Sequence, residues 1–180
     1  CASSAAHVAG KKLTSSETGT WLREHYHITP ADMKFLMDTL FTAGINHHVY
    51  HGTAYSPADA EWPGWVFYAS AQLNPQNPLW RDFSKLNEYA SRCQSVLQHG
   101  EPANDLLAYF PIHDIMHAPD RPIACKLTIK GDWFDSLQGA DTCRELWKRG
   151  YSFDYISDLQ IAGLESSEGH LSAPGGTYRS

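Results

Sequence analysis

The sequence predicts an α/β fold in which helices and strands alternate along the chain. Helical apolar stripes near residues 30–43 and 79–98 are separated by short segments rich in strand-forming side chains. Residues 105–110, DLLAYF, form a nearly continuous apolar run, which is typical of a strand buried on both faces. Strands that alternate with helices indicate βαβ units and a parallel sheet. Periodicity alone does not separate a closed (β/α)₈ barrel from a doubly wound sheet.

The N-terminal segment predicts a short helix followed by a short strand. Residues 2–9, ASSAAHVA, are small and compatible with a helix, and Gly10 suits the position just after its end. Residues 11–16, KKLTSS, predict a strand that leads directly to Glu17. We therefore expect the carboxylate of Glu17 directly after the carboxyl end of this strand.

The next helix has the clearest signals in the chain. Thr29 is a typical N-cap, Pro30 occupies the first helical position, and Gly44 follows the end. One apolar stripe with helical spacing is formed by Met33, Leu36, Met37, Leu40 and Phe41. Residues 45–51, INHHVYH, then predict a strand.

A long loop is predicted over residues 52–78, which are rich in proline, glycine, asparagine and aromatic side chains. Loops of this length within a compact domain are usually functional or disordered, and the aromatic content argues against disorder. Residues 79–98 predict a helix that Gly100 terminates.

The C-terminal part continues the alternation. Residues 132–149 predict a helix, residues 152–156 a strand, and residues 158–164 a short helical piece. The stretch HLSAPGGTYR at residues 170–179 resembles a hairpin.

Composition excludes several classes of protein. The 42 % hydrophobic and 19 % charged residues are typical of a globular chain rather than a disordered one. No apolar run approaches the ~20 residues that span a membrane. A net charge of -6 argues against a nucleic-acid partner, which requires a basic surface. The four cysteines form no CxxC pair, so neither a zinc knuckle nor a thioredoxin-like site is indicated.

The two ends of the sequence predict a piece of a longer protein. The chain begins without Met and without the basic and apolar regions of a signal peptide, and it stops where a strand is beginning.

Glu17 is the first candidate for chemistry. Functional residues of parallel α/β folds gather at the carboxyl ends of strands, where Glu17 is expected. Glycoside hydrolysis requires two carboxyl groups that flank the scissile bond, and Glu17 qualifies as one of them. From the residues alone, an exposed surface glutamate remains the commoner explanation.

Polar side chains around the strand at 45–51 are the second candidate. Asn46 and His48 are expected on one face of this strand, and His47 and His51 on the other. Hydrogen bonds to sugar hydroxyls suit these residues better than metal binding, because HxxxH spacing on a strand separates the two rings and no carboxylate lies nearby in the pattern. Satisfied structural histidines are the plainest alternative.

Trp65 and Tyr68 in the long loop are candidate stacking surfaces for a sugar ring, whereas Arg92 is interpreted as structural. His113 and Asp114 follow the strand at 105–110 but are assigned to a second domain. Glycine-rich phosphate motifs and the GxSxG nucleophile elbow are absent from the sequence.

Several segments, kept in order along nearly the whole chain, resemble the α-L-rhamnosidases of glycoside hydrolase family 106. The segments that carry this resemblance are AAHVAGKK at 5–12 running into SET at 16–18, AGIN at 43–46 with HG at 51–52, PG at 63–64, YASRCQ at 89–94 with LQHG at 97–100, DLLAYFP at 105–111 and GYSFDYI at 150–156.

The resemblance implies a fold and a domain organisation. Residues 1–100 would form the C-terminal part of a catalytic (β/α)₈ barrel, and residues 101–180 the start of a flavodoxin-like, amidotransferase-like domain with a structural role.

The resemblance also implies an activity: hydrolysis of terminal α-L-rhamnosyl linkages with inversion of configuration. Glu17 matches a late-barrel glutamate and would be the general base, while the acid would come from an earlier strand outside these residues. A calcium ion at the sugar hydroxyls, without assigned ligands, and a secreted or periplasmic location are further implications. His47 departs from the family pattern, in which a longer basic or apolar side chain is expected.

The expected partners are therefore a rhamnose-containing glycan or glycoside and the remainder of the parent polypeptide, and the piece alone is expected to be inactive. Two alternatives remain open at this stage: a hydrolase that uses a histidine-bound metal, and a non-catalytic sugar-binding module. Stoichiometric zinc would favour the metal hydrolase.

Overall fold

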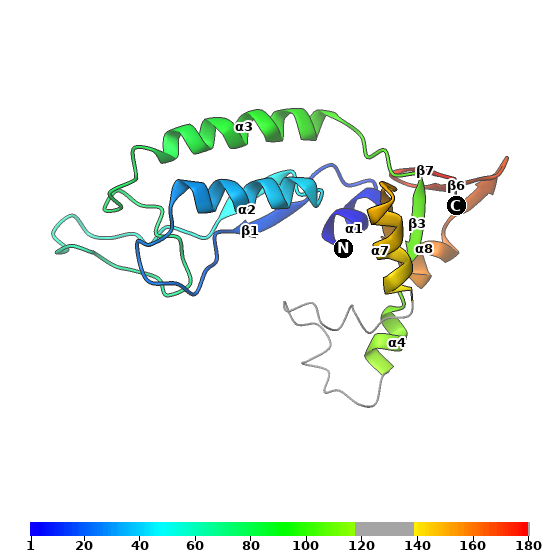
Figure 1. The fold of residues 1–180 in the computed structure, drawn as a ribbon, viewed down its shortest axis with the longest axis horizontal. Coiled ribbons are helices and arrows are strands. Elements are labelled where there is room, and N and C mark those ends of the chain that lie inside the picture. Colours follow the sequence, from blue (N-terminus) through cyan, green and yellow to red (C-terminus); the bar gives the residue numbers. More distant parts are fainter. Residues whose placement is uncertain (118–138, 180) are drawn as a thin grey trace. The chain divides into compact units, whose positions relative to one another are not determined.

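The computed structural model describes residues 1–117 and 139–179 (Figure 1). The chain divides into two compact units, a central unit of residues 13–101 and a terminal unit of residues 1–12 and 102–180. Both units combine helices with small sheets, which confirms the predicted α/β class. The described residues form no closed barrel, and their sheets have two or three strands each.

The central unit is built around a βαβ element. Strand β1 (Ser15–Thr18) pairs in parallel with β2 (His47–Tyr50), and α2 (Pro30–Thr42) connects them. A second helix, α3 (Phe83–His99), lies alongside α2 (Figure 1). The predicted parallel pairing is confirmed here. Glu17 lies inside β1 rather than after it, because the strand starts four residues later than predicted and extends to Thr18.

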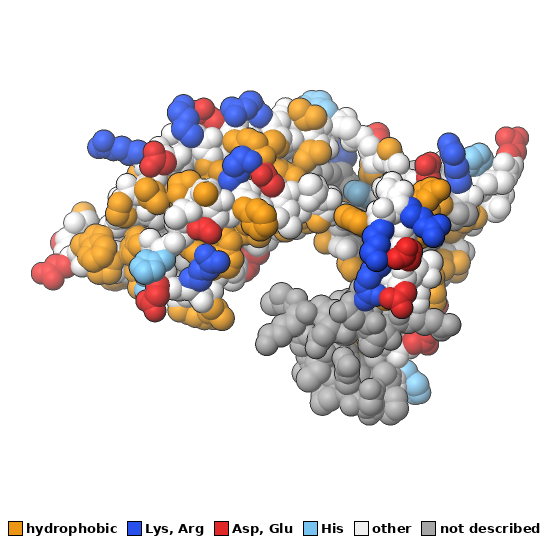
Figure 2. Space-filling view, in the orientation of Figure 1, with side chains coloured by type: hydrophobic (Ala, Val, Ile, Leu, Met, Phe, Trp, Pro, Cys, Tyr) orange, Lys and Arg blue, Asp and Glu red, His pale blue; other side chains and the backbone are white. Residues whose placement is uncertain are grey.

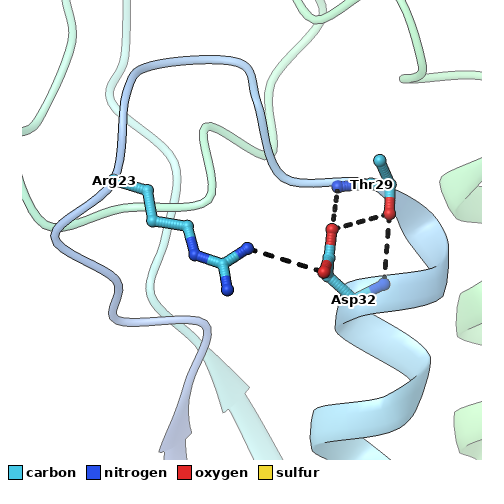
Figure 3. A network of polar contacts seen from close by, with 3 residues as sticks. All are labelled: Arg23, Thr29 and Asp32. Atoms are coloured by element: carbon cyan, nitrogen blue, oxygen red, sulfur yellow. Dashed lines mark hydrogen bonds and ion pairs between the residues drawn. The ribbon is translucent and has the colours of Figure 1, made fainter.

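Helix α2 begins at the predicted cap. The Thr29 hydroxyl accepts a hydrogen bond from the Asp32 amide at 3.2 Å, and the Asp32 carboxylate accepts one from the Thr29 amide at 3.0 Å (Figure 3). This reciprocal capping box satisfies two amides that the helix itself leaves unpaired. Arg23 lies 3.5 Å from the same carboxylate. The cap therefore fixes where the chain turns from the β1 loop into α2.

The core of the central unit is shared by both helices and the long loop. Met33 and Met37 of the predicted stripe have no exposed surface. Helix α3 starts at Phe83, four residues later than predicted, and ends before Gly100 as expected. The buried cluster consists of Ile28, Met33, Met37, Ala71, Leu73, Phe83, Leu86 and Ala90.

The long loop after β2 is held by its own polar groups. The carbonyl oxygen of Gly52 accepts hydrogen bonds from the Leu73 amide at 3.1 Å and the Ser70 hydroxyl at 2.8 Å. Buried Asn77 donates its side-chain amide to the Gln72 carbonyl oxygen at 3.0 Å. Residues 69–74 are all buried, so the far part of the loop folds back against its start at the end of β2.

The terminal unit contains a second parallel pair and a small antiparallel sheet. Strand β3 (Leu106–Tyr109) pairs with β4 (Phe153–Ile156), and α1 (Ala2–Val8) packs against β4. Its other elements are α4 (Ile112–His117), α7 (Ala140–Lys148), α8 (Asp158–Ala162), β5 (Glu165–Ser167), β6 (His170–Ala173) and β7 (Gly176–Tyr178). The predicted hairpin is β6 with β7.

A buried carboxylate holds the terminal unit together. Asp154 of β4 is 1 % exposed and lies 2.9 Å from the His7 ring of α1, while Tyr178 of β7 donates its hydroxyl to Asp154 at 3.1 Å. Burial raises the pKa of Asp154, but hydrogen bonds from His7, Asn104 and Tyr178 and the charge of His7 outweigh it and hold this pKa below its usual value. Helix α1, strand β4 and strand β7, which are far apart in sequence, are therefore joined by the Asp154 carboxylate. Because α1 belongs to this unit, the compact units divide at residue 12 as well as near residue 101, and the division into domains 1–100 and 101–180 stays a prediction.

Several predictions need correction in the terminal unit. Strand β3 was expected to be buried on both faces, but it is half-buried and Tyr109 is 49 % exposed, since β3 pairs with only one strand among the described residues. Of the helix predicted at 132–149, residues 132–138 lie outside the described residues and the remainder forms α7. Helix α4 and strand β5 were not predicted. Cys1, Cys93 and Cys143 are free thiols, and Cys125 lies outside the described part.

We expect Met37→Ala to lower the free energy of unfolding of the central unit by about 2–5 kcal/mol, because it opens a cavity in a fully buried site. Phe35→Ala on the same helix is the matched control, since Phe35 is 75 % exposed. Urea denaturation followed by circular dichroism measures both variants. Equal effects of the two substitutions would contradict the described core.

The capping box of Thr29 and Asp32 also predicts how the Asp32 carboxyl titrates. The Thr29 hydrogen bonds hold the pKa of Asp32 below its usual value. This stabilisation is present above the ordinary carboxyl pKa of about 3.9 and is lost as the pH falls through the lowered value. Thr29→Ala should therefore raise the pKa of Asp32 in an NMR titration and destabilise the protein by about 1 kcal/mol at pH 7. An unchanged Asp32 pKa in the variant would argue against the capping box.

Candidate functional site

The carboxyl ends of β1 and β2 meet at one edge of the central unit. The two strands are parallel, and Thr18 at the end of β1 is paired with Tyr50 at the end of β2. The loops at residues 19–28 and 51–82 both leave from this edge. In parallel α/β folds such an edge is where binding and catalytic side chains gather.

The two faces of this strand pair have different surroundings. Tyr50 donates its hydroxyl to Asn87 of α3 at 2.9 Å, and the His48 ring packs edge-on against Phe41 of α2 with centroids 4.6 Å apart. Thr18, on the same face, has no exposed surface. The other face carries exposed Glu17, and Val49 there is 54 % exposed. One face is therefore covered by the helices and the other is open; we call them the helix face and the open face.

Glu17 projects from the open face. Its carboxylate accepts a hydrogen bond from the Thr20 hydroxyl at 2.6 Å, and its side chain is exposed. Thr20 lies three residues further along the loop that leaves β1, so the contact orients the carboxylate toward the carboxyl edge. An ionised carboxylate accepts hydrogen bonds only, and in this position it can take a proton from a water molecule or hold a sugar hydroxyl.

His48 lies on the helix face, away from Glu17. Its Nδ1 atom is 3.0 Å from the Thr18 hydroxyl and 3.4 Å from the Ser16 hydroxyl. Its Nε2 atom is buried without a hydrogen-bond partner among the described residues. Burial, and secondly the neighbouring His47, lower the pKa of His48. The structure therefore places a neutral ring against Phe41, where it helps to fix α2 on the strand pair.

Asn46 lies at the opposite, amino end of β2. Its side-chain oxygen accepts a hydrogen bond from the Thr14 amide at 2.9 Å, and its carbonyl oxygen accepts one from Gln98 of α3 at 2.7 Å. These contacts join the starts of β1 and β2 to the end of α3. The structure does not bring Asn46 together with Glu17.

His51 shares the carboxyl edge with Glu17. It follows β2 directly, its amide donates to the Thr18 carbonyl oxygen at 2.7 Å, and its Nδ1–H donates to the Ala69 carbonyl oxygen at 2.7 Å. The ring packs edge-on against Phe67 at 5.0 Å. Since Nδ1 carries the proton in this contact, Nε2 is the acceptor of the neutral ring.

The long loop displays Trp65 and Tyr68 at the surface. They are 62 % and 67 % exposed, and the Trp65 amide donates to the Ser56 hydroxyl at 2.8 Å. Sequence reasoning missed an aromatic pair in which the Tyr26 ring packs against the Trp62 ring at a tilt. The aromatic content of the loop was visible in the sequence, but nothing there links Tyr26 to it.

Arg92 was interpreted as structural, and it lies on α3 beside Cys93 and Val96 in an apolar groove between α2 and α3. His113 lies 3.8 Å from Asp158 at an exposed position of the terminal unit. His113 therefore belongs to the terminal unit, and Arg92 belongs to the groove between the two helices.

The described residues offer no set of three histidine, cysteine, aspartate or glutamate side chains that could hold a metal ion. Calcium requires six to eight oxygen ligands, usually with several carboxylates. At the carboxyl edge, Glu17 is the one carboxylate on the open face of the described strand pair. The residues present therefore do not fit a calcium site by themselves.

Comparison with protein families decides the classification. The family model for glycoside hydrolase family 106, described as alpha-L-rhamnosidase, matches residues 1–180. The chain belongs to glycoside hydrolase family 106. The family resemblance drawn from the sequence is thereby confirmed, and the chain is part of a family of glycosidases.

Two similar proteins are each much longer than this chain. A protein of Formosa agariphila, described provisionally as a beta-glucuronidase, is 26 % identical over 181 residues, which cover 98 % of this chain and 13 % of that protein. A rhamnosidase structure from Novosphingobium sp. PP1Y matches with a TM-score of 0.66 and 23 % identity, covering 98 % of this chain and 15 % of that one. The family 106 chain thus spans about one seventh of the length of these relatives.

Among the described helices, none is both long and apolar enough to cross a membrane. The chain therefore offers no membrane-spanning helix within residues 1–117 and 139–179.

The position of His48 predicts a pH effect on stability. Its pKa is lowered in the folded state, so the unfolded chain binds the proton more tightly. Stability contributed by the neutral ring is present above the unfolded pKa of about 6.5 and is lost as the pH falls below it. Urea unfolding of the wild type and His48→Gln between pH 5 and 8 should show a difference that shrinks toward low pH. A difference independent of pH would contradict the buried, neutral ring.

Proposed function

We propose that the chain is part of the active centre of an α-L-rhamnosidase, in which Glu17 is the general base of an inverting hydrolysis. The observation that carries this proposal is the position of Glu17 on the open face, at the carboxyl edge of a parallel strand pair. Family membership supports the reaction class. The match covers only 13 % and 15 % of the lengths of the two relatives, which supports the proposal that the chain is a piece of a longer polypeptide.

The open face suits the interior of a barrel. In a (β/α)₈ barrel the helices cover the outside and side chains of the other face point inward. Helices α2 and α3 cover one face of β1 and β2 and leave Glu17 on the other. We therefore assign residues 1–100 to the last part of a catalytic barrel and residues 101–180 to the start of a flavodoxin-like domain.

The chemistry requires two carboxyl groups with separate tasks. Glu17 would take one proton from a water molecule as the water oxygen bonds to the anomeric carbon. The bond from that carbon to the leaving oxygen breaks, and a carboxylic acid from an earlier part of the parent protein gives that oxygen a proton. Inverting enzymes keep the two carboxyl groups ~6.5–9.5 Å apart so that the water fits between them. The chain on its own would be inactive for lack of that acid.

The remaining site residues divide by position. His51 lies at the edge and offers Nε2 to a sugar hydroxyl, and Trp65 and Tyr68 offer exposed ring faces for stacking. Asn46 and His48 were also predicted to bind substrate. We now propose that they position the strands, because one lies at the amino end and the other on the helix face.

The substrate would be a glycan or glycoside with terminal rhamnose, acted on in a secreted or periplasmic location. Calcium was expected from the family resemblance, and its ligands would have to come from other parts of the parent protein. No step of the proposed reaction depends on it. The provisional name of the Formosa agariphila relative makes a β-glucuronide the second substrate class to assay.

Glu17→Gln in the full-length parent should lower kcat on an aryl α-L-rhamnoside by about 10²–10⁴-fold with little change in KM, because the amide cannot accept the proton. Glu88→Gln on α3 is the matched control. It removes a carboxylate that pairs with Lys85 away from the strand edge, and it should retain wild-type activity.

Azide added to Glu17→Ala separates a base from a structural residue. A small anion in the emptied space can attack the anomeric carbon without deprotonation, so a glycosyl azide of inverted configuration is expected by NMR. Wild-type kcat in Glu17→Gln would reject the assignment. Activity of the wild type on β-glucuronides alone would reject the rhamnosyl substrate while leaving the role of Glu17 intact.

A further inference from the structure

Two aromatic side chains from different loops pack against each other at the surface of the central unit. Tyr26 lies in the loop that leaves β1, and Trp62 lies in the loop that leaves β2. Their ring centroids are 5.8 Å apart, with an angle of 32° between the planes. Both loops start at the carboxyl edge that carries Glu17, so the pair belongs to the same end of the strand pair.

A hydrogen bond helps to hold the pair, in which Tyr26 is partly buried and Trp62 is exposed. The Tyr26 hydroxyl donates to the Pro63 carbonyl oxygen at 2.8 Å, which ties its ring to the residue next to Trp62. Tyr26 itself has a φ of 64°, a left-handed conformation that non-glycine residues seldom adopt. Such a conformation persists only where its surroundings enforce it, and it is found mainly at functional positions.

The turn that carries Trp62 is equally constrained. The Gly64 amide donates to the Glu61 carbonyl oxygen at 2.7 Å, and Gly64 has a φ of 76°. A Cβ atom at Gly64 would lie 2.5 Å from the Ser56 hydroxyl oxygen, which also accepts the Trp65 amide. Glycine therefore suits this position, and the backbone of the turn that carries Trp62 is constrained.

Despite these constraints, Trp62 remains 69 % exposed. Exposed apolar area is unfavourable in water, and a rigidly displayed aromatic group is typical of a binding surface. In Figure 2, hydrophobic side chains reach the surface at the end of the central unit where Figure 1 draws this loop. Side chains that line an enclosed pocket for a terminal sugar would be buried. The exposed Trp62 therefore suits the outer rim of a binding site rather than such a pocket.

We propose that Tyr26 and Trp62 form a binding platform for a neutral pyranose ring on the leaving-group side of the scissile bond; this rests on the proposed glycosidase function. The apolar C–H face of a pyranose stacks on an aromatic ring. Residues 52–80 contain Asp59 and Glu61 and no lysine or arginine, and the one arginine of residues 19–28, Arg23, lies 3.5 Å from the Asp32 carboxylate. The carboxylates of Asp59 and Glu61 can accept sugar hydroxyls and repel an anionic uronate, which selects a neutral ring.

The test uses the full-length parent protein and two probes. One is a neutral gluco-tetrasaccharide capped with a terminal α-L-rhamnosyl residue, and the other is the same tetrasaccharide without the cap. Trp62→Ala should raise KM for the capped probe about tenfold with kcat nearly unchanged, and should weaken binding of the uncapped probe similarly in calorimetry. Tyr26→Phe keeps the ring but loses the Pro63 contact, so a smaller rise in KM, about two- to threefold, is expected.

Two controls separate the possible outcomes. Trp147→Ala on α7 removes a tryptophan of similar exposure, 66 %, from the terminal unit and should change neither probe. Unchanged KM and uncapped binding in Trp62→Ala would overturn the platform. So would a loss of self-association in ultracentrifugation with saccharide binding intact, because the pair would then be a protein interface. Failure of the wild type to cleave any rhamnoside would reject the proposed function, while uncapped binding that depends on Trp62 would still support the platform.

Discussion

The rest of the site depends on the register between β1 and β2. Pairing Ser15 with His47 through Thr18 with Tyr50 aligns the carboxyl ends of the two strands and fixes which side chains share a face. A shift of one residue in either strand would turn its side chains to the opposite face. In the observed register Thr18 and His48 pack toward the helices while Glu17 stays on the open face.

Contacts at both ends of the strand pair maintain this register. Asn46 joins the amino ends through the Thr14 amide, and His51 joins the carboxyl ends through the Thr18 carbonyl oxygen. Helix α2 packs against one face of the strand pair. Its start is fixed by the cap at Thr29, and it buries Met33 and Met37. Asn46 and His51 therefore support the strand pair, while exposed Glu17 makes no hydrogen bond with the described helices.

Local signals in the sequence predicted much of this arrangement. The cap at Thr29 and the apolar stripe through Met33 and Met37 correctly predicted α2, because both depend on residues close in sequence. Strand alternation predicted that His48 and His51 lie on opposite faces; the structure places His48 on the helix face and His51 just after the end of β2. The alternation did not reveal which face the helices cover, since that depends on α3, almost forty residues away. The predicted start of β1 was wrong because the residues KKLTSS have weak strand propensity. The limits of β1 are set instead by its pairing with β2.

The aromatic platform illustrates the same limit. Nothing near Tyr26 predicts that its hydroxyl reaches Pro63, because the contact joins loops 37 residues apart.

The sequence also could not supply the position of Glu17 relative to a sugar. That is tested most directly by a crystal structure of the full-length protein with a non-hydrolysable α-L-rhamnoside bound. The account predicts a Glu17 carboxylate oxygen about 3 Å from a water molecule that faces the anomeric carbon from the side opposite the leaving group. A Glu17 side chain turned away from the sugar, with another carboxylate holding that water, would contradict it.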